Sequence, residues 1–166
     1  MNNEIINIVP QPSASLVEVR RDNVRFPRLH TYPKDTAHRM MMAMVIKANE
    51  WFGCKPDAGE VSQIAWDLYT ELMADNEGMR AFNLSFEEIG RAIRKAATGQ
   101  SVEFYGKVSF YFLYRCIIQF VKTDVLEANR QMLRLAETNR EQLMQERTQL
   151  ITGAAARQML EHSQIK

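Results

Sequence analysis

Residues 109–152 read SFYFLYRCIIQFVKTDVLEANRQMLRLAETNREQLMQERTQLIT and contain neither proline nor glycine. Because these two residues interrupt helices most strongly, the stretch predicts one long helix that begins near Ser109 and continues toward Gly153. Its first part, Phe110 to Val121, is apolar nearly all round, which is typical of a helix buried on several sides. This part is therefore expected to belong to the core.

After Lys122 the apolar residues narrow to a thin seam whose register shifts, and the other faces carry Arg, Glu, Gln and Asn. At 1.5 Å per residue the predicted helix is about 60 Å long, which a small domain cannot cover. We expect part of it to be free or to pack on another chain, as a protruding helix or an imperfect coiled coil. The candidates for contact with a protein partner, or for self-association, are Val125, Met132, Leu135, Leu143 and Leu150.

Three earlier segments repeat apolar residues at the spacing of one helical face. They predict helices over about 36–52, over about 58–74, and from Ser85 to about residue 98. The third has the clearest start, Leu84-Ser85-Phe86-Glu87-Glu88-Ile89, where Ser-x-x-Glu is a capping box inside a hydrophobic staple. Side-chain caps are expected from Asp35 or Thr36 for the first helix and from Asp57 for the second.

These elements predict an all-α fold, a compact bundle of about four helices with a long C-terminal helix and an irregular N-terminal arm. The predicted divisions are an irregular or partly disordered arm over 1–34, a helical core domain over 35–123, and a protruding charged helix with its tail over 124–166. All five prolines lie before residue 57, and the arm has no sustained period apart from one short helix around Ser15–Asn23. Two alternatives are open for the arm, which either packs on the core through Val24, Phe26, Leu29 and Tyr32 or is mobile.

The composition is that of an ordinary globular protein, with 46% hydrophobic and 25% charged residues. A net charge of +1 means that attraction to nucleic acid or to an anionic membrane has to come from local patches. The first ten residues do not resemble a signal peptide, and no stretch has the length and apolarity of a membrane span. Cys54 and Cys116 stand alone and are expected to be reduced, buried thiols, so the expected location is the cytoplasm.

The charges are unevenly distributed along the chain. Residues 57–82 contain six acids and one base, whereas residues 85–123 contain six bases and three acids. A basic helix face beside an aromatic–glycine segment can contact phosphates and stack a base. The alternative, which we favour, is that these bases form a solvated face that the acidic helix partly neutralises. For the arginines of the arm, a solubilising role is likewise favoured over contact with nucleic acid or a protein partner. The DNA-contact candidates are Arg91, Arg94, Lys95, Lys107 and Tyr105.

The motifs of common catalytic sites are missing from the sequence. His30, His38 and His162 lack metal-ligand spacing, and there is no Cys-x-x-Cys pair. Phosphate-binding glycine loops and a G-x-S-x-G elbow are also missing. Glu88 is accounted for by the capping box, and the methionine cluster at 40–44 is expected to be core rather than a partner groove. We therefore expect a non-catalytic protein with no catalytic residue, cofactor or metal.

The stretch from Phe86 to Asn129 resembles a group of uncharacterised proteins from phages and mobile elements of Bacteroidetes-type bacteria. The similar features are FEEIGRAIRK at 86–95, Thr98-Gly99, EFYG at 103–106 and the aromatic-rich helix after Ser109, preceded by Pro12-Ser13. The resemblance implies an accessory or adaptor role in DNA replication or maintenance. The alternative is a structural or oligomerisation protein that associates through its long C-terminal helix and has no nucleic-acid role.

Overall fold

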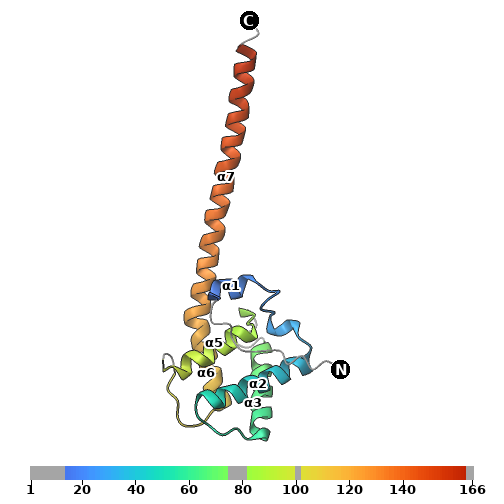
Figure 1. The fold of residues 1–166 in the computed structure, drawn as a ribbon, viewed down its shortest axis with the longest axis vertical. Coiled ribbons are helices and arrows are strands. Elements are labelled where there is room, and N and C mark those ends of the chain that lie inside the picture. Colours follow the sequence, from blue (N-terminus) through green and yellow to red (C-terminus); the bar gives the residue numbers. More distant parts are fainter. Residues whose placement is uncertain (1–13, 75–81, 100–101, 164–166) are drawn as a thin grey trace. The chain divides into compact units, whose positions relative to one another are not determined.

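A computed structural model describes the backbone of residues 14–74, 82–99 and 102–163, and side chains within these ranges up to residue 153. The fold is all-α, as predicted: a helical bundle followed by a long C-terminal helix, with no strand in the described ranges. The chain divides into two compact units, 1–128 and 129–166. In order (Figure 1), the α-helices are α1 (Leu16–Arg21), α2 (Lys34–Trp51), α3 (Ala58–Met73), α5 (Phe86–Ala97), α6 (Phe110–Phe120) and α7 (Leu126–Ser163).

Local capping chemistry fixes where most of these helices begin. The Asp57 carboxylate accepts the amides of Gly59 and Glu60 at 3.0 Å each, and the Ser109 hydroxyl accepts the amide of Phe112. At α5 the predicted capping box of Ser85 and Glu88 is present. The expected cap on α2 was wrong: that helix begins at Lys34, directly after Pro33, and has no side-chain cap, because Pro33 itself occupies the N-cap position.

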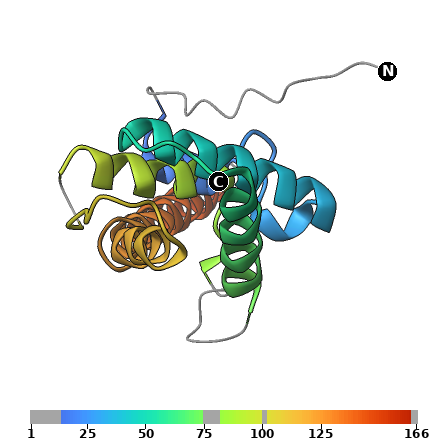
Figure 2. The ribbon, with the colours of Figure 1, turned by 90° about the horizontal axis from the view of Figure 1, so that it is seen from below.

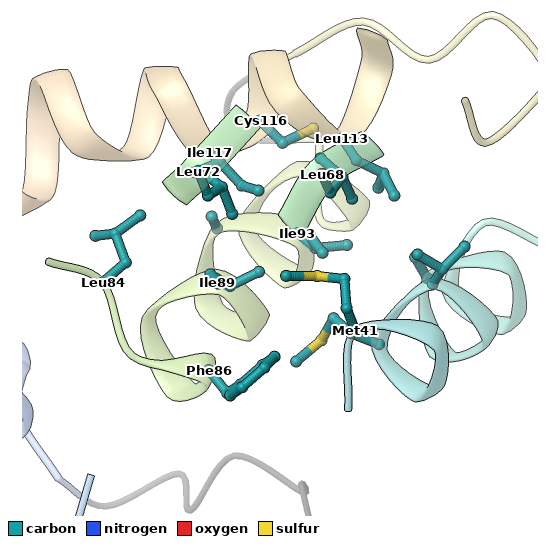
Figure 3. Packing of buried hydrophobic residues seen from close by; sticks show 14 of the residues in the cluster. Met41, Leu68, Leu72, Leu84, Phe86, Ile89, Ile93, Leu113, Cys116 and Ile117 are labelled. Carbon is teal, nitrogen blue, oxygen red and sulfur yellow. The ribbon is translucent and has the colours of Figure 1, made fainter. Parts of the chain in front are cut away.

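The core of the first unit lies where α2, α3, α5 and α6 meet. Figure 2 shows α3 crossing the direction of α2, and both α2 and α6 pack against α5. The side chains of these helices point toward one another in the centre (Figure 3), with Met41 from α2 among aliphatic residues of its neighbours. Met40, Met41 and Met44 are buried, as the core interpretation of the methionine cluster predicts. Other core members are Leu68, Leu72, Ile89, Ile93, Leu113, Cys116 and Ile117.

A π-helical turn, Val121–Val125, separates α6 from α7. A π-turn inserts one residue into the α-helical ladder and so rotates everything after it. Val125 is completely buried in the first unit and is therefore unavailable as the exposed contact residue that the sequence suggested.

The described part of the arm packs against the core. Its helix α1 lies inside the predicted Ser15–Asn23 range and carries a capping box between Ser15 and Glu18. Leu29 is buried, and the Tyr32 ring meets Phe86 edge-on at 5.5 Å. Val24, in contrast, is 92% exposed. Residues 1–13 of the predicted arm lie outside the described ranges.

Within the described ranges, no helix combines the length and apolarity needed to cross a membrane.

Candidate functional site

The DNA-contact candidates on α5 have partners within the chain. Arg91 donates from Nε to Glu87 at 2.8 Å and from Nη2 to the Ala14 carbonyl at 2.8 Å. The Arg94 guanidinium lies 5.1 Å from the centre of the Trp51 ring, a cation–π contact. Arg91 therefore links α5 to the arm, and Arg94 links it to the end of α2.

The other basic candidates are also paired. Lys95 lies 2.7 Å from a carboxylate oxygen of Asp124 in the π-turn, and Lys107 lies 2.7 Å from Glu60 of α3. The hydrogen bond to Glu60 raises the pKa of Lys107. Lys95 and Lys107 therefore pair with different elements, Lys95 with the π-turn and Lys107 with α3.

Tyr105 is the most exposed of the candidates, at 77%. Its hydroxyl donates to Glu103 at 2.5 Å, and this hydrogen bond raises the pKa of the phenol. Lys107, two residues later, is about two-thirds exposed along its side chain. Because exposed ion pairs contribute little to stability, Lys107 can readily exchange Glu60 for another anion.

A cluster around Glu88 joins the arm to the bundle, and sequence reasoning assigned this carboxylate only a capping role. Glu88 is completely buried, and Ser85 donates to it from both its amide and its hydroxyl, at 2.8 and 2.9 Å. The Arg28 guanidinium reaches the same carboxylate at 2.7 Å, and Arg20 pairs with its other oxygen. Two arginines of the arm therefore share one buried acid.

Further hydrogen bonds hold the two guanidinium groups in place. Arg28 donates from Nε to Asn23 at 2.8 Å and from Nη2 to the carbonyl of Arg20, and Arg20 donates to the Phe82 carbonyl at 2.9 Å. Burial lowers the pKa of Arg28. These hydrogen bonds engage the guanidinium groups of both arginines, so the cluster has a structural role: it fixes the arm to the bundle. The sequence analysis favoured the arm arginines as solubilising, and for Arg20 and Arg28 this was wrong, because both side chains pair with the buried carboxylate of Glu88.

The protein-contact candidates after residue 129 lie on an exposed helix. Met132 is half-buried, and every residue from Leu133 to Gly153 is exposed. At 3.6 residues per turn, Met132, Ala136, Leu143 and Leu150 fall within about 40° of one another around the α7 axis. Leu135 lies about 80° to one side of this row. Of the sequence candidates, Met132, Leu143 and Leu150 therefore share a face, whereas Leu135 lies beside it.

A second apolar row runs along α7 and was missed by the sequence interpretation. Leu133, Met144 and Ile151 lie about 90° from the first row, on the side away from Leu135. Arg140 and Arg147 fall between the two rows. We call this surface the apolar face of α7; it comprises Leu133, Ala136, Arg140, Leu143, Met144, Arg147, Leu150 and Ile151. In the sequence, the polar residues Asn139 and Arg140 interrupt the apolar pattern. The structure shows that α7 continues through them as one helix, so the apolar residues on either side align in one row.

The two thiols differ in their environment. Cys116 is fully buried, and burial raises the pKa of its thiol to about 11, so it is protonated at neutral pH. Cys54 is half-buried, with its sulfur 3.7 Å from the carbonyl oxygen of Gly106. No group of three or more His, Cys, Asp or Glu side chains within the described ranges is placed to hold a metal ion.

Comparison of the chain with protein-family models, with curated proteins and with solved structures gives no significant match, so the resemblance to mobile-element proteins stays a prediction.

Proposed function

We propose that the protein is a non-catalytic assembly protein that self-associates through the apolar face of α7. The observation that carries this proposal is the run of large apolar side chains left in solvent along that helix. Leu143 and Leu150 are 65% and 75% exposed, and Leu133, Met144 and Ile151 are similarly open. Burying each such side chain is worth about 1.5–3 kcal/mol.

The stability of long helices supports the same proposal. Helices in water gain most of their stability from packing an apolar face rather than from intrinsic propensity. Residues 133–153 of α7 leave their side chains exposed, so within a single chain they lack that packing. A second helix laid along the apolar face supplies it. Contiguous exposed apolar surface of this kind is typical of protein–protein contact sites.

Sedimentation velocity of the wild-type chain over about a hundred-fold range of concentration tests this proposal, since self-association follows mass action. We expect a concentration-dependent dimer that is lost in Leu143→Glu, because the substitution places a charge in the middle of the face. Thr138→Glu is the matched control: it adds the same charge on the opposite side of α7 and is expected to leave the dimer intact. A monomer at every concentration would refute the proposal.

A second proposal is an accessory role in DNA transactions, with contacts through Arg91, Arg94, Lys95, Lys107 and Tyr105. Its support is the resemblance and the exposure of Tyr105 beside the exchangeable Lys107. The support is weaker than for assembly, because the basic candidates already form ion pairs or cation–π contacts with acidic or aromatic side chains of the same chain. Fluorescence anisotropy with a labelled duplex at low and moderate salt tests it. No binding at low salt, or binding unchanged by Arg94→Glu, would exclude this role.

A further inference from the structure

We propose that α7 of one chain pairs antiparallel with α7 of a second copy, with Leu133 of each chain opposite Leu150 of the other. This inference rests on the proposed assembly function and adds the identity, direction and register of the partner helix. It is argued from the two arginines within the apolar face and from the acid at its border. These residues distinguish the two possible directions of pairing.

Arg140 and Arg147 lie between the two apolar rows and are seven residues apart, so they occupy equivalent positions of successive heptads. A parallel pair in register would place Arg140 against Arg140 and Arg147 against Arg147. Two like charges would then meet in successive layers of the interface, which is unfavourable in a partly desolvated setting. Parallel pairing therefore places the charged residues of the face where they oppose association.

Antiparallel pairing removes this conflict. A twofold axis near residues 141 and 142 makes residue i contact residue j of the partner, and residue j contact residue i. No arginine then faces another arginine, and the long Arg147 side chain lies over a small alanine, so large and small residues alternate across the interface. The layers pair Leu133 with the partner's Leu150, Ala136 with the partner's Arg147, and Arg140 with the partner's Leu143.

The same register also brings opposite charges together. Glu137 follows Ala136 by one residue, or 1.5 Å along the axis, and borders the apolar face on the side of Met144. It therefore lies beside the partner's Arg147, and the twofold axis creates this pair twice. Within the described residues, the side chains of Glu137 and Arg147 form no hydrogen bond or ion pair, so both are available. Charge complementarity thus selects a second antiparallel copy as the occupant.

The register predicts how distances between identical sites vary along the helix. Residue 142 lies opposite residue 141 of the partner, so two labels at 142 are almost level. Residue 149 lies opposite residue 134, so two labels at 149 are displaced along the axis by about 22 Å. Positions 142 and 149 are seven residues apart and lie on the same side of the helix. The label-to-label separation perpendicular to the helix axis is therefore the same at both positions. In a parallel pair the distances at 142 and 149 would be equal.

The experiment uses the full-length chain with Cys54→Ser and, in separate proteins, Gln142→Cys or Gln149→Cys carrying a nitroxide spin label. Double electron–electron resonance measures the label-to-label distance, and sedimentation measures the mass of the same samples. We expect dimers with a clearly longer distance at 149 than at 142. A dimer with equal distances at both sites would overturn the antiparallel register and leave the assembly function standing. Monomers without dipolar coupling at any concentration would refute both.

Discussion

Nη1 of Arg28 lies 2.7 Å from Oε2 of Glu88, a carboxylate with no exposed surface. The two residues are separated by 60 positions, and Arg28 is itself only 5% exposed. Removing one partner of a buried ion pair is costly, because the remaining charge is left without compensation in a low-dielectric setting. If the arm leaves the bundle, Glu88 loses this partner, so the packed arm contributes to the stability of the bundle.

Glu88→Gln is expected to destabilise the protein strongly. The substitution keeps the size of the side chain but removes the buried negative charge that faces the guanidinium groups of Arg20 and Arg28. The expected loss is about 3–5 kcal/mol in the free energy of unfolding. Urea denaturation followed by circular dichroism measures it.

Glu50→Gln is the control for this prediction. Glu50 pairs with Lys47 at 2.6 Å, but about half of each side chain is exposed. An exposed pair of this kind contributes less than about 1 kcal/mol. Equal effects of the two substitutions would show that the buried cluster has no special role.

The local parts of the fold were predictable from sequence, and the long-range contacts were not. The start of α5 was found because Ser85 and Glu88 are three residues apart, and their spacing alone defines a capping box. The ion pair of Glu88 with Arg28 depends on how the chain folds back, which periodicity cannot reveal. The π-turn was missed for a different reason: Val121–Val125 contains no proline or glycine to mark an interruption.

The candidate surfaces show the same limit. Arg94 and Lys95 were correctly placed on one helix, but their partners Trp51 and Asp124 lie on other elements and could not be paired with them from sequence. On α7, Leu143 and Leu150 were found because they are seven residues apart. The second row, from Leu133 to Ile151, was missed because polar residues interrupt it over more than two turns.

The buried thiol of Cys116 gives a stability component that depends on pH. Burial raises its pKa in the folded protein from 9.0 to about 11. Below pH 9 the thiol is protonated in both states, so stability is unaffected; above pH 9 the unfolded chain loses the proton more readily, and stability falls until about pH 11. The loss is on the order of 2–3 kcal/mol over this interval. Urea titrations of the wild type and of Cys116→Ala between pH 8 and about pH 11 should show a shallower decline in the variant; identical slopes would contradict it.

Amide exchange along α7 is expected to depend on protein concentration. Residues 133–153 have exposed side chains, so in the single chain their helix is held by local hydrogen bonds alone and opens easily. Association through the apolar face adds packing and slows the exchange. Hydrogen–deuterium exchange measured by mass spectrometry at low and high concentration should show this slowing for residues 133–153 and no change for α6. Exchange in α7 that is independent of concentration in the wild type, or a slowing that persists in Leu143→Glu, would contradict the assignment of the interface.

Reversing the charges of Glu137 and Arg147 tests the register through a rescue. In the antiparallel pair, Glu137→Arg places two arginines beside each other across the interface, and Arg147→Glu places two acids there. Each single variant is expected to weaken the dimer by about five- to tenfold, a typical effect for a partly exposed charge pair that becomes repulsive. The double variant restores opposite charges at both contacts and should recover most of the affinity in sedimentation experiments. Additive weakening in the double variant would mean that the two residues do not meet. In a parallel pair they would lie ten residues apart, about 15 Å along the axis, where no rescue is possible.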